Sequence, residues 1–128
     1  MRDILVIDDD PVFGQLIMTR LELAGLSCAL HLGPFGTMAA IRQVQPRVVI
    51  LDVTMPGLDG TRISEMISKQ RNLSEMKVLL YSSLSPSELE PLVTAHRAHA
   101  SLNKSASQKQ FIACVEDLMR TARRANQL

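Results

Sequence analysis

One stretch decides the fold of this chain, Val48-Val49-Ile50-Leu51-Asp52-Val53-Thr54-Met55-Pro56-Gly57-Leu58-Asp59-Gly60. Four apolar residues, three of them β-branched, run into an aspartate, and proline and glycine follow. An unbroken apolar run of this length predicts a strand that is buried on both faces of a parallel sheet. Such a strand places Asp52 at its carboxyl end, where open α/β sheets bind their ligands.

A second apolar run, residues 4–7, also ends in acidic residues, Asp8-Asp9-Asp10. Neighbouring strands of a sheet lie about 4.8 Å apart. If these two strands are neighbours, Asp8, Asp9 and Asp52 crowd together at one edge of the sheet. Two unit charges about 4 Å apart repel by about 4 kcal/mol at an effective dielectric constant of 20. The cluster therefore needs a compensating charge.

Capping and turn roles explain the other aspartates of these two segments. Asp10 precedes Pro11, which is typical of a helix N-cap followed by proline at the first helical position. Asp59-Gly60 is typical of a turn or of a second cap. Neither role fits the three aspartates that follow the buried strands directly. We therefore predict a functional acidic site that binds a hard divalent cation such as Mg²⁺.

The composition indicates a single globular domain. The chain has 128 residues, of which 46% are hydrophobic and 21% charged, and this length suits one core. The net charge of +1 gives no strong attraction to nucleic acid or to an acidic membrane. The only basic run, residues 120–124, suits a helix C-terminus. We expect one domain over residues 1–128, no output domain in this chain and no direct contact with nucleic acid.

Cysteine use and hydropathy point to the cytoplasm. Cys28 and Cys114 do not make a disulfide framework, and free thiols are ordinary in a reducing compartment. No apolar stretch approaches the roughly 20 residues of a membrane span. The start of the chain also lacks the pattern of a signal peptide. We expect a cytoplasmic protein that does not bind membranes.

Five predicted strands alternate with five predicted helices. The strands are residues 4–7, 27–32, 48–52, 77–81 and 100–102, the second of them at an edge. The helices are residues 11–24, a short helix that ends at 45, residues 61–70, a helix after residue 84, and residues 107–124. This alternation implies βαβ units with right-handed crossovers. We predict an α/β, flavodoxin-like (βα)5 doubly wound parallel sheet with strand order 2-1-3-4-5.

The fourth helix is the hardest to delimit. Ser85 or Ser87 can cap it, together with Glu88 or Glu90. Pro91, however, falls where a proline inside a helix removes a hydrogen bond and clashes with the preceding turn. This helix therefore either starts late or is kinked.

The strand ends supply a set of groups suited to a phosphoryl group: Asp8, Asp9, Asp52, Ser82 and Lys104. A carboxylate can accept a phosphoryl group as an acyl phosphate. A metal ion neutralises the carboxylates and the transferring oxygens. Lysine and a hydroxyl contact the remaining oxygens, because this transfer depends mainly on positioning and charge stabilisation.

These segments resemble the receiver domain of two-component response regulators. The resemblance covers essentially the whole chain and rests on residues 4–10, 51–60, 78–83 and 102–104, of which the second segment is highly specific. It implies that Asp52 is the phosphoacceptor, served by a sensor histidine kinase or a histidine phosphotransfer protein.

The resemblance also implies roles for the other site residues. Asp9, Asp52 and the backbone carbonyl of Thr54 would bind Mg²⁺ directly, and Asp8 would help through water. The phosphoryl oxygens would be held by Ser82 and Lys104. Such a domain is a signalling module rather than an enzyme, since it catalyses only its own phosphorylation and dephosphorylation.

Three positions depart from the family pattern. Ser101 replaces the usual aromatic residue three places before the lysine, and Ser105 replaces the usual cis-proline, which leaves an amide donor. Arg97 stands where a helix-ending glycine is common. All three lie on the face of the fourth helix, fifth strand and fifth helix, where the family usually binds its downstream protein. The output step is therefore altered here.

Two other functions stay open from the sequence. A phosphorylation-independent interaction module with receiver shape would suit the altered face, although the acidic site is complete. A phosphatase of the haloacid dehalogenase type would suit the Asp-x-Asp spacing of residues 8–10, with Glu116-Asp117 as the further acidic pair, but it leaves Asp52 unexplained. His31, His96 and His99 are scattered and show no metal-binding spacing.

Overall fold

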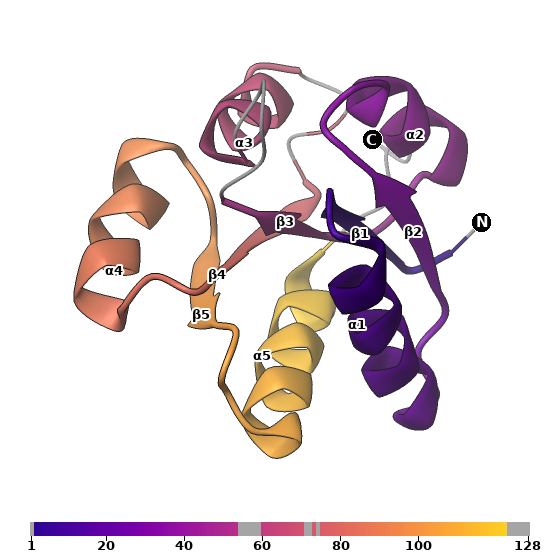
Figure 1. Ribbon diagram of the computed structural model, residues 1–128. Helices are drawn as coiled ribbons and strands as arrows, with labels where there is room; N and C mark the ends of the chain where they lie inside the picture. The colour runs from indigo at the N-terminus through magenta and orange to yellow at the C-terminus, as the bar shows by residue number, and fades with distance from the viewer. Residues whose placement is uncertain (1, 54–59, 71–72, 74, 123–128) are drawn as a thin grey trace.

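The computed structural model describes residues 2–53, 60–70, 73 and 75–122, in which strands and helices alternate (Figure 1). The strands are β1 (Ile4–Asp8), β2 (Cys28–Leu32), β3 (Val48–Asp52), β4 (Lys77–Ser82) and β5 (Ala100–Asn103). The helices are α1 (Pro11–Leu23), α2 (Thr37–Val44), α3 (Gly60–Ser68), α4 (Pro86–Ala95) and α5 (Gln108–Thr121). The predicted elements are all present, and their ends move by only a few residues.

The strands form one parallel sheet with the order β2-β1-β3-β4-β5, which confirms the predicted fold and topology. Ile4 pairs with Val48, and Val48 pairs with Lys77. The less hydrophobic strand β2 lies at an edge, as predicted. Because all five strands run in the same direction, their carboxyl ends lie along one edge of the sheet.

Side chains of the central strands fill a separate core on each face of the sheet. Ile4 and Val6 pack in the core that α1 and α5 cover, whereas Leu5 and Ile7 pack in the core that α2, α3 and α4 cover. The two groups of helices lie on opposite sides of the sheet (Figure 1). Every residue of β1 and β3 is buried. This two-sided burial explains why both runs are continuously apolar rather than alternating.

Residues that are typical of helix ends mark both ends of α1. The side chain of Asp10 accepts hydrogen bonds from the backbone N–H groups of Val12 (3.0 Å) and Phe13 (3.3 Å), and Pro11 is the first helical residue. After the helix, Gly25 adopts a φ of +77°, the left-handed conformation that favours glycine. The predicted N-cap is therefore confirmed, and Gly25 has the conformation of a glycine that ends a helix.

Helix α4 begins early despite its internal proline. The Ser85 hydroxyl accepts a hydrogen bond from the Glu88 N–H (3.3 Å), and the Glu88 carboxylate accepts one from the Ser85 N–H (3.2 Å). This capping box fixes the start at Pro86 and leaves Pro91 inside the helix. A late start is therefore wrong, and a kink at Pro91 stays a prediction. Arg97 has a φ of +58°, which explains why glycine is common at this position.

Helix α5 packs against the sheet as predicted. It buries Phe111, Val115 and Leu118, and Ala122 is buried just beyond its end. The predicted end of this helix at residue 124 lies outside the described residues. Over the described part of the chain, none of the helices combines the length and the apolar character needed to cross a membrane.

Candidate functional site

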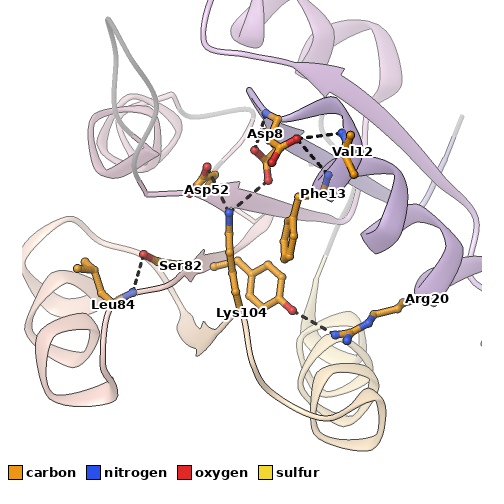
Figure 2. Close-up of polar contacts among 10 residues, drawn as sticks. Asp8, Val12, Phe13, Arg20, Asp52, Ser82, Leu84 and Lys104 are labelled. Carbon is orange, nitrogen blue, oxygen red and sulfur yellow. Dashed lines mark hydrogen bonds and ion pairs between the residues drawn. The ribbon is translucent and has the colours of Figure 1, made fainter.

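The predicted site residues follow four neighbouring strands and meet at one edge of the sheet (Figure 2). Asp8 ends β1, Asp52 ends β3 and Ser82 ends β4, while Lys104 directly follows β5. The parallel register brings these ends together although they are far apart in the sequence. Thr54, the remaining predicted site residue, lies outside the described residues.

Three carboxylates form the centre of the site. One carboxylate oxygen from each of Asp8, Asp9 and Asp52 lies within 4.8 Å of the others. Asp8 and Asp52 are only 3% and 7% exposed. One oxygen of Asp8, Oδ1, accepts a hydrogen bond from the Asp10 N–H (2.9 Å). The crowding expected from the sequence is thus present, and it combines mutual repulsion with partial desolvation.

Lys104 supplies a cation beside this cluster. Its Nζ lies 3.6 Å from Asp8 Oδ2 and 3.5 Å from Asp52 Oδ2 (Figure 2). One ammonium against three carboxylates leaves the group with excess negative charge. A cluster of oxygen ligands with this charge fits a hard divalent cation, as the chemistry of the donors predicted.

A pocket of about 360 Å³ opens beside Asp52 and is lined by Asp52, Ser82, Ser83, Leu84 and Lys104. Ser82 is 2% exposed, and its hydroxyl oxygen accepts a hydrogen bond from the Leu84 N–H (3.1 Å). The hydroxyl proton remains available to a ligand in the pocket. The pocket therefore presents a carboxylate, a hydroxyl donor and an ammonium to the same space.

Sequence reasoning missed the role of Asn103. Its amide nitrogen donates hydrogen bonds to the backbone carbonyls of Ser83 (3.3 Å) and Leu84 (2.7 Å). Its amide oxygen accepts one from the Ser105 N–H (2.8 Å), which is the amide donor that a proline would lack. Asn103 thus joins the segment after β4 to the segment after β5. Its position directly before Lys104 was the feature of the sequence that pointed to a place near the site.

An aromatic group beneath the site was also missed. Phe13, on α1, lies with its ring centroid 4.3 Å from Lys104 Nζ, and its ring makes a tilted contact with that of Tyr81. Arg20 donates a hydrogen bond to the Tyr81 hydroxyl (3.4 Å). Burial raises the pKa of Tyr81, and the charge of Arg20 acts in the opposite direction. Phe13 shares a helical spacing with Ile17 and Leu21, which indicates a place on one apolar face of α1 but does not show its neighbours.

The cysteines and histidines, which can also bind metal ions, do not belong to this cluster. Among the described residues, the only group of three or more that could hold a metal ion is the aspartate trio. Both cysteines are free, and burial raises the pKa of Cys28 and of Cys114. The histidines make separate contacts: His31 with the Phe35 carbonyl, His96 with Glu65, and His99 with the Val78 N–H.

A phosphatase of the haloacid dehalogenase type needs a further acidic pair at its site, and Glu116 and Asp117 do not supply one here. Glu116 and Asp117 are exposed on α5, and Asp117 pairs with Arg120. Asp10, the second aspartate of the Asp-x-Asp spacing, caps α1. The geometry therefore gives this interpretation no support.

Comparisons with known proteins agree with one another. The family model of the response regulator receiver domain matches residues 4–116. The DNA-binding dual master transcriptional regulator RpaA of Synechocystis is 30% identical over 84 residues, which cover 66% of this chain and 35% of RpaA. The chain thus spans about a third of the length of that relative.

Two solved structures share the fold. A putative response regulator from Chloroflexus aurantiacus has a TM-score of 0.86 at 18% identity, with 93% of this chain and 98% of that chain covered. The chemotaxis protein CheY4 of Vibrio cholerae has a TM-score of 0.83 at 19% identity, with 92% and 98% covered.

Proposed function

The chain belongs to the response regulator receiver family, and on that premise we propose that Asp52 accepts a phosphoryl group from a sensor histidine kinase or a histidine phosphotransfer protein. The observation that carries this proposal is the surroundings of the Asp52 carboxylate. It lines the pocket together with Ser82 and Lys104, and its Oδ2 lies 3.5 Å from Lys104 Nζ. Asp8 does not line that pocket.

In the proposed transfer, a carboxylate oxygen of Asp52 forms a bond to phosphorus while the bond from phosphorus to the donor imidazole nitrogen breaks. The imidazole leaves with the electron pair of that bond and takes up a proton. The Lys104 ammonium stabilises charge on the phosphoryl oxygens, and the Ser82 hydroxyl donates a hydrogen bond to one of them. The protein acts on its own side chain and is not an enzyme for an external substrate.

We propose Mg²⁺ as the cofactor of this site. Asp9, Asp52 and the backbone carbonyl of Thr54 would bind the ion directly, and Asp8 would bind it through water. The excess of carboxylates over ammonium groups supports this assignment. When bound, the ion neutralises the carboxylates and the transferring oxygens.

Phosphorylation then changes the binding of a downstream protein at the face of α4, β5 and α5, because it adds negative charge beside the segments that follow β4 and β5. Ser101 lies on β5, opposite Leu80. With serine in place of the usual ring, the switch cannot use an aromatic rotation at this position. A module that binds its partner without phosphorylation is the alternative, and the complete acidic set argues against it.

Labelling with acetyl phosphate and Mg²⁺ tests the proposal. We expect intact-mass analysis to show one phosphoryl group on the wild-type chain and none on Asp52→Asn. Binding of the downstream protein should differ between the two labelling states. Equal labelling of the variant would place the phosphoryl group elsewhere, and an unlabelled wild type would favour the phosphorylation-independent module.

A further inference from the structure

The Lys104 ammonium lies against an aromatic ring and beside two carboxylates. Its distances to Asp8 Oδ2 and Asp52 Oδ2 are 3.6 and 3.5 Å, longer than those of charge-assisted hydrogen bonds. The face of Phe13 lies 4.3 Å from the same nitrogen, well within the range of a cation–π contact. The ring therefore limits where the ammonium can lie between the two carboxylates.

Phe13 is in turn supported by a column of buried rings. Its centroid lies 5.9 Å from that of Tyr81, and Tyr81 lies 5.4 Å from Phe111. Tyr81 is 2% exposed and Phe111 is 0% exposed. These separations are typical of interacting aromatic pairs. The column connects the site to the core between the sheet and helices α1 and α5.

The middle ring of the column, Tyr81, is also held at its hydroxyl. Arg20 donates hydrogen bonds to the Tyr81 hydroxyl and to the Ala106 carbonyl, each at 3.4 Å. The backbone carbonyl of Arg20 accepts a hydrogen bond from the Gln108 side chain (2.9 Å). Contacts from α1 and from the start of α5 converge here and hold the Tyr81 ring next to Phe13.

We propose that Phe13 is a positioning residue for Lys104 and that Tyr81 supports it through a tilted contact between the two rings. The ring holds the ammonium between the carboxylates before a phosphoryl group arrives, so that less reorientation is needed in the transfer. This inference rests on the proposed phosphorylation of Asp52. It adds that the rate depends on a ring that contacts neither the phosphoryl group nor the metal.

The first test compares rates of labelling by acetyl phosphate with saturating Mg²⁺. Phe13→Leu keeps an apolar side chain without a π-face, and we expect it to slow labelling about threefold to tenfold. Phe13→Tyr keeps the face and should restore the wild-type rate. Phe35→Leu is the matched control, because Phe35 is 80% exposed.

The second test does not depend on phosphorylation. Lys104 Nζ lies 4.3 Å from the Phe13 ring centroid, so we expect the protons of the neighbouring ε-methylene group to show an upfield ring-current shift in the NMR spectrum. We expect this shift to persist in Phe13→Tyr and in Phe35→Leu and to disappear in Phe13→Leu, while thermal unfolding confirms that all variants are folded.

The outcomes separate the two proposals. If the wild type is labelled and the folded Phe13→Leu variant is labelled equally fast, the positioning role is wrong and the phosphoacceptor assignment stands. If the wild type shows no ring-current shift at Lys104, the positioning role is also wrong. If the wild type is not labelled at all, the proposed function fails and this inference fails with it.

Discussion

At the scale of single residues, three consecutive aspartates have different surroundings because the chain leaves a buried strand and enters a helix between them. Asp8 ends β1 and is buried, whereas Asp10 caps α1 from the surface. Asp9 joins Asp8 and Asp52 in the acidic cluster. The carboxylates of this cluster repel one another, and the single Lys104 ammonium offsets only part of that repulsion.

Asp52→Asn tests this imbalance of charge. The substitution removes the repulsion between Asp52 and the carboxylates of Asp8 and Asp9, and it weakens the attraction to Lys104. We expect it to raise the free energy of unfolding by about 1 kcal/mol in metal-free buffer of low ionic strength, after allowance for solvent screening. Urea denaturation measures the change. Saturating Mg²⁺ should remove this gain in the free energy of unfolding, because the ion stabilises the wild type more than a variant that has lost a proposed metal ligand.

The matched control is Asp117→Asn, since this carboxylate is exposed on α5 and distant from the cluster. Its effect should stay within about 0.5 kcal/mol. A less stable Asp52→Asn variant in metal-free buffer would mean that the pairing with Lys104 outweighs the repulsion.

At the scale of elements, α4 contains two prolines in different environments. Pro86 is the first helical residue, where the missing N–H has no helical partner to lose, and Pro91 lies inside the helix. We expect Pro91→Ala to raise the free energy of unfolding by about 1–3 kcal/mol, because it restores a hydrogen bond and removes a clash. Chemical denaturation measures this, with Pro86→Ala as the near-neutral control. Equal effects of both substitutions would show that Pro91 is not strained.

The turn between α4 and β5 is held to β4 by a histidine. His99 Nδ1 accepts a hydrogen bond from the Val78 N–H (2.9 Å), which requires a ring nitrogen without a proton. Partial burial, and next the Lys77 ammonium, lower the pKa of His99 below its ordinary value of 6.5. The unfolded chain therefore binds a proton first as the pH falls. This contribution to stability is complete above about pH 6.5 and is lost at lower pH.

We expect the free energy of unfolding to fall as the pH decreases from 7 to 5, and part of this slope to disappear in His99→Asn. Asparagine places an acceptor near the position of Nδ1 and does not titrate in this range. Urea denaturation across the pH range gives the slope. An unchanged slope in the variant would assign the pH dependence to other groups.

At the scale of the whole molecule, the topology and most of the site followed from the sequence. Runs such as residues 48–51 are apolar at every position, and this pattern indicated central parallel strands. The acidic residues that follow these runs indicated at which edge of the sheet the site lies. Asp8, Asp9, Asp52, Ser82 and Lys104 could thus be placed together from strand ends alone.

Contacts between elements could not be predicted in the same way. Phe13 has the spacing of a core residue, and nothing in that spacing shows that its ring lies under Lys104. Asn103 acts through backbone carbonyls of another segment, and its position before Lys104 does not show which groups it contacts. For α4, Pro91 indicated a late start, whereas the possible capping residues indicated an early one. The helix begins at Pro86, directly after the Ser85 cap.

The central claim is that distant strand ends make one pocket that binds Mg²⁺ and a phosphoryl group at Asp52. Titration of the ¹⁵N-labelled protein with Mg²⁺ and beryllofluoride, which stands in for the phosphoryl group, tests it most directly. We expect saturable shifts of the backbone signals of Asp9, Asp52, Ser82 and Lys104, and no beryllofluoride-dependent shifts in Asp52→Asn. Unchanged spectra of the wild type, or shifts that the variant retains, would contradict the claim.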